Sequence, residues 1–268
     1  MSESIAASTV SPDPRPEPIA AVQVGLWHSF RTMMRWSMAS IGSMLPLIIV
    51  IQAMLAAGIV VGFGFLIPDI TADTALFLSS GAPTILLLTI GLVIVPQGVS
   101  RARASGALDY QRALPVARPL LLIVDLTVWT LIALPGVVIG LLVAWLRYDL
   151  TFAFDWPVLI LASLLVATMA AAVGYAIAVT LPATLAQLAS QVLVFFVLLF
   201  SPITFPVSQL PDWFQTLHLV LPIQAAADLL RAGIASNVFA AEWRDLLVLV
   251  LWTAFGLLVT TRALVRRR

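Results

Sequence analysis

The sequence predicts an all-α, polytopic membrane protein with six transmembrane helices. Hydrophobic residues make up 61% of the 268 residues and charged residues only 10%, a composition typical of membrane proteins. Long apolar runs recur along the chain, and each can cross a hydrocarbon core of about 20 helical residues. A β-barrel would instead show short alternating segments, because backbone polar groups in lipid must be satisfied by a closed sheet.

The N-terminal part predicts two segments outside the spans. Residues 1–21 are rich in proline and serine and lack an apolar core, so we expect a disordered cytoplasmic tail and no signal peptide. Residues 22–38 place apolar side chains on one side and His28, Arg31 and Arg35 opposite, with Trp27 at the boundary. This pattern predicts an interfacial amphipathic helix. A ragged start to the first span is the alternative.

A transmembrane domain is predicted over residues 22–268. Its six spans are expected at about 39–67, 83–99, 120–146, 156–180, 184–200 and 246–262. The third span carries a Pro135-Gly136 break near its middle. Residues 201–244 are rich in proline and aromatic residues, and Pro211 and Pro222 resemble first-turn prolines, so short extracellular or re-entrant helices are expected between spans five and six.

Polar and glycine residues inside the spans suggest helix contacts or a path for a substrate. Gly58 and Gly62 are four residues apart, a spacing that permits close helix approach in a dimer or within one subunit. The remaining candidates are amide and hydroxyl side chains, which suit a translocation path, a dimer contact or ordinary interhelical hydrogen bonds: Gln52, Thr184, Gln187 and Gln191.

Asp125 is the one acidic residue placed well within an apolar run. A carboxylate at the centre of a bilayer costs about 3 kcal/mol on the insertion scale and therefore invites a partner. We expect a structural ion pair with Arg118, or with Arg112. The alternative is a proton relay, which would make the protein a proton-coupled secondary transporter that uses Asp125.

The distribution of arginine predicts the orientation. With six spans, ten arginines near span ends fall on one side, whereas Arg147, Arg231 and Arg244 fall on the other side with eight acidic residues. Positive charge near span ends stays in the cytoplasm. Both termini are therefore expected to be cytoplasmic.

Composition also limits the chemistry. The chain has no cysteine and no lysine, and its two histidines are predicted on opposite sides of the membrane. A phosphate-binding loop needs a lysine, and neither a metal cluster nor a nucleophile with its base can be assembled convincingly. The chain is not expected to be an enzyme or to bind a cofactor, so any ATP and Mg²⁺ would be bound by another chain. No nucleic-acid partner is expected.

The segment from Ser100 to Pro119 interrupts two apolar runs with four arginines. Ala107, Tyr110 and Leu114 recur at helical spacing, which favours a short two-faced helix that ends at Pro115. A helix of this kind can bind in a groove of another protein. A solvated basic loop that only fixes the topology explains the spacing equally well.

Two motifs resemble the permease subunits of ABC-2 type exporters, which include drug-resistance and lipid-linked export permeases. The first runs from Gly106-Ala-Leu-Asp-Tyr110 to Leu114-Pro115. The second, more specific motif runs from Phe205 to Phe214 and is followed by Pro222 and Arg231. One departure is that Arg101, Arg103 and Ala104 stand where the family usually has acidic residues before the glycine.

The resemblance implies function as a dimer with a second permease subunit, identical or different, and with two cytoplasmic ABC ATPase subunits. It implies a multi-pass protein of the bacterial cytoplasmic membrane, in contact with lipid, that exports an amphipathic or hydrophobic drug, lipid or glycolipid by alternating access. The ATPase-coupling role is expected in the first cytoplasmic loop, at Arg101, Arg103, Gly106, Leu108, Asp109, Tyr110, Arg112, Leu114 and Pro115.

Overall fold

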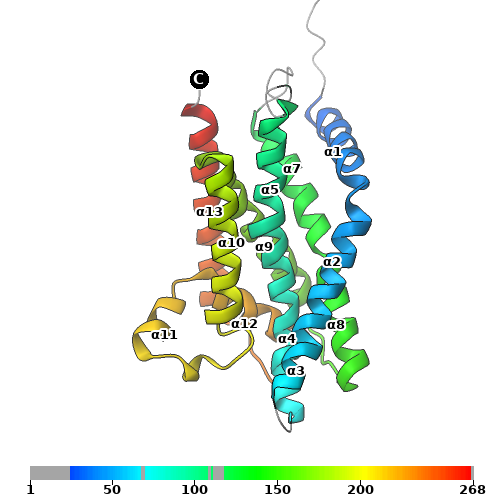
Figure 1. Ribbon diagram of the computed structural model, residues 1–268, viewed down its shortest axis with the longest axis vertical. Helices are drawn as coiled ribbons and strands as arrows, with labels where there is room; N and C mark the ends of the chain where they lie inside the picture. Colours follow the sequence, from blue (N-terminus) through cyan, green and yellow to red (C-terminus); the bar gives the residue numbers. More distant parts are fainter. Residues whose placement is uncertain (1–24, 68–69, 108–109, 111–117, 267–268) are drawn as a thin grey trace, which may run out of the picture.

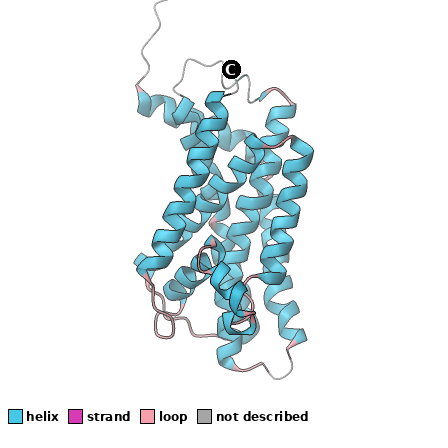
Figure 2. Ribbon diagram, turned by 90° about the vertical axis from the view of Figure 1, so that its left-hand side faces the viewer, coloured by secondary structure: helices cyan, strands magenta, loops and turns pink. Residues whose placement is uncertain are grey.

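The computed structural model describes residues 25–67, 70–107, 110 and 118–266 and shows a bundle of roughly parallel and antiparallel helices (Figures 1 and 2). Six helical segments in the described residues are long and apolar enough to cross a membrane. In that part of the chain, β-pairing is limited to an isolated bridge between Ala153 and Ala235. The predicted all-α polytopic fold is confirmed.

The first three helices form the N-terminal arm and the first span. Helix α1 (Leu26–Gly42) leads into α2 (Leu45–Ala57), a π-helical turn η1 (Gly58–Gly62) and the short α3 (Phe63–Leu66). The apolar side of α1, with Phe30, Met33 and Met34, packs on the bundle core. The predicted amphipathic helix is therefore present, displaced to 26–42, and the candidate span begins at Leu45.

The second span is a long helix with a wide turn inside it. It consists of α4 (Ala72–Thr89), a π-helical turn η2 (Ile90–Ile94) and α5 (Val95–Ala104). The predicted start at Pro83 is too late, because Pro83 lies inside α4 and the helix begins after Thr71. The hydroxyl of Thr71 accepts a hydrogen bond from the Thr74 amide at 3.3 Å, a side-chain N-cap that the apolar pattern did not reveal.

The third and fourth spans follow. The third consists of α7 (Arg118–Ala133) and α8 (Pro135–Tyr148), which meet at the predicted proline-glycine break. The fourth is α9 (Trp156–Thr180), where Asp155 accepts a hydrogen bond from the Val158 amide at 3.3 Å and so caps the helix. Its predicted range, 156–180, agrees with the observed helix.

The last third of the chain contains two spans and a folded connection. The fifth span is α10 (Ala183–Phe200), and the sixth is α13 (Trp243–Arg266). Between them lie a 3₁₀ turn η3 (Val207–Gln209), α11 (Asp212–His218) and α12 (Pro222–Ile234). Helices α11 and α12 are bent by 72° relative to each other, so the expected short helices between spans five and six are present.

Helix α9 lies at the centre and contacts α4, α5, α7, α10, α12 and α13. Its buried face consists largely of alanine and glycine. A Cβ atom on Gly174 would overlap the carbonyl oxygen of Gly91 in η2, and one on Gly256 of α13 would lie 2.9 Å from the carbonyl carbon of Ala172. These small residues let the second and sixth spans approach α9 at backbone distance.

The start of α1 and the end of α13 lie at one end of the bundle, which we call the terminal end (Figure 1). The end of α5 also lies there, whereas α3, α11 and α12 lie toward the opposite end (Figure 1). This arrangement follows from an even number of spans.

The contact between Gly91 and Gly174 predicts a strong steric effect. Gly174→Ala should lower the stability of the purified chain by about 1–3 kcal/mol, because an extra carbon has no space there. Thermal unfolding in detergent measures this loss. Gly42→Ala is the matched control, since its Cβ would meet no atom within 4 Å. Equal midpoints for the two variants would contradict the close approach.

Candidate functional site

The predicted coupling segment begins at the terminal end of α5. Arg101 and Arg103 lie in the last turn of this helix, so both belong to the second span and not to a loop. Gly106 follows with a φ of +74°, a left-handed conformation that favours glycine and ends the helix. Tyr110 is 64% exposed. The other predicted members lie outside the described residues and stay predictions: Leu108, Asp109, Arg112, Leu114 and Pro115.

Arg103 points into the bundle. Its Nη1 donates hydrogen bonds to the carbonyl oxygens of Ala178 and Leu181, the latter at 3.0 Å, at the C-terminal end of α9. The last carbonyls of a helix lack intrahelical partners, and a cation there is favoured by the helix dipole. Arg103 thus ties α5 to α9. Sequence reasoning placed it on the ATPase-facing surface and missed this contact.

A polar groove of about 430 Å³ runs between α5 and α10. Its lining includes Thr184, Gln187 and Gln191, the residues of α10 that the sequence indicated for a substrate path or dimer contact, and all three are exposed. Gln97 of α5 lines the opposite side and was missed. The sequence feature that could have identified Gln97 is its amide side chain inside an apolar run, one helical turn before Arg101.

Gln52 lies in the interior. Its side chain is 1% exposed, and Nε2 donates a hydrogen bond to the carbonyl of Ile132 at 3.2 Å, beside the break between α7 and α8. Pro135 has no amide hydrogen for the preceding turn, so carbonyls near the break need other donors. In this conformation Gln52 therefore serves the packing of the subunit and reaches neither a partner subunit nor the polar groove.

Gly58 and Gly62 lie on the open side of η1. A Cβ atom at either position would meet no atom within 4 Å. Close packing within the chain is therefore not the reason for these glycines. A contact outside the chain remains as a prediction.

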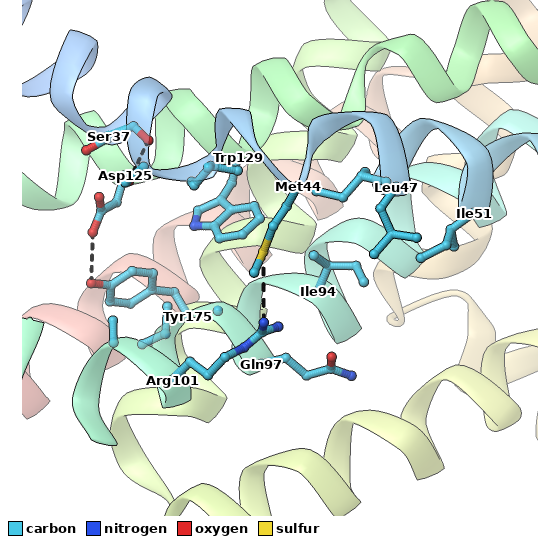
Figure 3. Close-up of a pocket in the computed structure, with 16 residues that line it drawn as sticks. Ser37, Met44, Leu47, Ile51, Ile94, Gln97, Arg101, Asp125, Trp129 and Tyr175 are labelled. Carbon is cyan, nitrogen blue, oxygen red and sulfur yellow. Dashed lines mark hydrogen bonds between the residues drawn. The ribbon is translucent and has the colours of Figure 1, made fainter. Parts of the chain in front are cut away.

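Asp125 lies beside a second cavity, of about 380 Å³, between α1, α2, α5, α7 and α9 (Figure 3). The hydroxyl of Tyr175 in α9 donates a hydrogen bond to Asp125 Oδ2 at 3.2 Å. The Arg118 side chain lies outside the described part, so the predicted ion pair stays a prediction. The sequence did not identify Tyr175 as a partner of Asp125.

The polar side of α1 faces away from the bundle. Trp27 is 75% exposed, and His28, Arg31 and Arg35 are also exposed. Trp27 stacks on Phe30 with ring centroids 5.8 Å apart. This arrangement fits the predicted surface helix, with charged side chains available to headgroups.

Arg231 is a second internal arginine, at the opposite end of the bundle. It is 2% exposed, bonds Asp228 at 3.1 Å and donates to the carbonyl of Ile203. Its guanidinium carbon lies 3.8 Å from the centroid of the Phe77 ring. The residue therefore joins α12, α4 and the connection after α10, because a buried guanidinium needs several acceptors.

A protein-family model described as "ABC-2 family transporter protein" matches residues 72–262. The chain belongs to the ABC-2 family of transporter proteins. As an ABC-2 permease, it is a multi-pass transport subunit of an ABC transporter and not itself a catalytic enzyme. The matched region starts at α4 and leaves α1, α2 and α3 outside. No curated protein matches the chain significantly.

The tie from α5 to α9 predicts unequal roles for two neighbouring arginines of the permease. Arg103→Leu should destabilise the purified chain by about 1–3 kcal/mol, because the α9 carbonyls lose a charged donor. Arg101→Leu is the matched control, since Arg101 is exposed and its described hydrogen bond is a 3.9 Å contact to Met44 Sδ. Unfolding midpoints in lipid-free detergent measure both. A larger loss for Arg101→Leu would refute the assignment.

Proposed function

We propose that this chain is the membrane subunit of an ATP-driven exporter. It works as a dimer with a second permease subunit, and two cytoplasmic ATPase subunits bind ATP and Mg²⁺. The exported substrate is an amphipathic or hydrophobic molecule such as a drug, lipid or glycolipid. Family membership supports the ATPase partner, and the polar groove between α5 and α10 supports the substrate class.

The groove is the observation that carries this proposal. Exposed amides and hydroxyls facing hydrocarbon would leave hydrogen-bonding groups unsatisfied. The face of α10 that carries Gln187 and Gln191 therefore suits a water-accessible path or a second subunit better than lipid. The groove is lined by three amides, one hydroxyl and the apolar Leu188, with no charged side chain among these residues, so it fits an amphipathic substrate better than a highly charged one.

Helix α5 provides the connection between the ATPase and the groove. One end of α5 leads into the predicted coupling segment, while Gln97 in its first turn lines the groove. Arg103 fixes the same helix to α9. A movement of the coupling segment that follows ATP-induced closure would thus reach the groove through a short, hydrogen-bonded helix. The ATPases can drive this change only by binding the two states of the permease differently.

The terminal end faces the cytoplasm in this proposal, and the membrane is the bacterial cytoplasmic membrane. The arginines of α1, α5 and the C-terminal part of α13 gather at that end. The opposite end carries Asp73, Asp149, Asp155 and Asp212. This asymmetry follows the preference of positive charge for the cytoplasmic side.

If the predicted coupling segment binds the ATPase subunit, substitutions in this segment should prevent that binding. Charged residues at Leu108 and Leu114 should abolish co-purification with the ATPase subunit and substrate-stimulated ATP hydrolysis, because an apolar face would no longer fit an apolar groove. Val238→Glu is the control, since Val238 is 58% exposed in the connection before α13. Wild-type values for both measurements in the double variant would remove the assignment.

The orientation predicts a labelling pattern, and the natural chain contains no cysteine to interfere. Ser105→Cys should react with a membrane-impermeant maleimide only after permeabilisation, whereas Val238→Cys should react in intact cells. Both parent residues are exposed. Ser105 caps α5, which ends at the terminal end, and Val238 follows α12, which lies toward the opposite end. The reverse pattern would invert the topology and exclude a cytoplasmic ATPase at the predicted segment.

A further inference from the structure

The cavity beside Asp125 has an ordered sequence of chemical groups along its length (Figure 3). Asp125, Tyr175 and Trp129 lie at one end, and Arg101 with Met44 follows. Leu47, Ile51 and Ile94 form the other end (Figure 3). From the Asp125 end to the Ile51 end, the lining of the cavity is therefore first acidic and aromatic, then basic, and finally apolar. It lies on the other side of α5 from most of the polar groove, and Gln97 lines both.

The direction of the helices orients this sequence relative to the membrane. Helix α5 runs from Ile94 toward Arg101 and the terminal end, whereas α2 runs from Leu47 to Ile51 away from it. The charged part therefore lies nearer to the bundle end, and the apolar part lies deeper. A lipid of the adjacent leaflet has the same orientation, with its headgroup at the surface and its chains toward the midplane.

The cavity is open along its apolar wall. Met44, Leu47 and Ile51 line it and are 46%, 61% and 38% exposed. A volume of about 380 Å³ would hold a headgroup and the first part of its chains. The remaining acyl carbons could continue along α2 into the bilayer. A small soluble ligand would leave this exposed apolar wall uncovered.

We propose that this cavity binds a phospholipid whose headgroup carries a primary ammonium and a phosphate. The ammonium lies at Asp125, between a carboxylate and the rings of Trp129 and Tyr175, which attract cations by their faces. The phosphate lies toward Arg101, whose guanidinium can turn from its weak contact with Met44 to a phosphate oxygen.

Charge complementarity decides between this ligand and simpler amphiphiles. In the described part of the chain, no basic side chain lines the cavity at the Asp125 end, so a purely anionic lipid would place its negative charge there without a counter-charge. A purely cationic amphiphile would meet Arg101. A headgroup with both charges satisfies both side chains. This inference does not require that the lipid is transported. It rests on the proposed function in one respect only, because the proposed orientation makes the adjacent leaflet the cytoplasmic one.

The test measures lipid selectivity in the full-length chain. The purified permease is reconstituted in nanodiscs that contain equal amounts of phosphatidylethanolamine and phosphatidylglycerol, and native mass spectrometry counts the lipids that it retains after release. We expect phosphatidylethanolamine to be enriched about tenfold, as one charge-assisted hydrogen bond would give. Equal retention indicates annular lipid only and overturns the proposal.

Asp125→Asn and Arg101→Gln separate the two halves of the headgroup. Asp125→Asn keeps an acceptor for Tyr175 and removes the charge, so it should abolish the enrichment. Arg101→Gln should lower retention of both lipids and leave their ratio unchanged. Asp73→Asn is the matched control, because Asp73 is exposed in the first turn of α4. Unchanged enrichment in Asp125→Asn overturns the site.

A third measurement separates a phospholipid from a cationic amphiphile. Dodecylammonium, which has no phosphate, should displace phosphatidylethanolamine poorly from the wild-type chain. Complete displacement at equal concentration would overturn the assignment of the phosphate. The displacement by dodecylammonium and the ratio of the two retained lipids are both measured on the wild-type chain. The proposal can therefore be tested even if a variant does not fold. Failure of ATPase binding would leave these lipid measurements unaffected, so the two proposals fail separately.

Discussion

The backbone contact between Gly91 and Gly174 is the constraint on which the rest of the bundle depends. In lipid the hydrophobic effect does not drive one helix against another, so van der Waals contact and interhelical hydrogen bonds must do so. Alanine and glycine on α9 allow the second and sixth spans to approach closely. The position of α5 against α9, and with it both the polar groove and the Asp125 cavity, follows from this small-residue packing.

Two arginines with hydrogen bonds to the interior, the half-buried Arg103 and the buried Arg231, lie at opposite ends of the permease. Arg103 ties α5 to the end of α9, and Arg231 ties α12 to α4 and to the carbonyls after α10. Each satisfies backbone oxygens that lack helical partners, which is the main difficulty of ending or breaking a helix near a membrane. The charged residues of this chain thus divide into those that organise the fold and those, such as Arg31, Arg35 and Arg101, that remain exposed.

Much of the fold could be predicted from the sequence, because hydrophobic length and proline position are local properties. The six spans, the limits of α9 and the break at Pro135 follow from them. The start of α4 was missed because the predicted span began at Pro83, where the long apolar run starts, whereas a membrane helix tolerates proline in its interior. The interior roles of Gln52, Arg103 and Tyr175 were not predictable, since each depends on a partner at least 50 residues away.

The π-helical turn η2 contains Gly91 and lies between α4 and α5, where the second span packs on α9. Such a turn accommodates an additional residue, and each residue of an α-helix rotates the chain by about 100°. If Ile90–Ile94 relaxed to α-helical geometry, the whole of α5 would turn about its axis relative to α4. Gln97, which lines both cavities, would then change its position relative to them, and the hydrogen bonds of Arg103 would have to break. The wide turn and the hydrogen bonds of Arg103 together therefore set the rotation of α5 against α9.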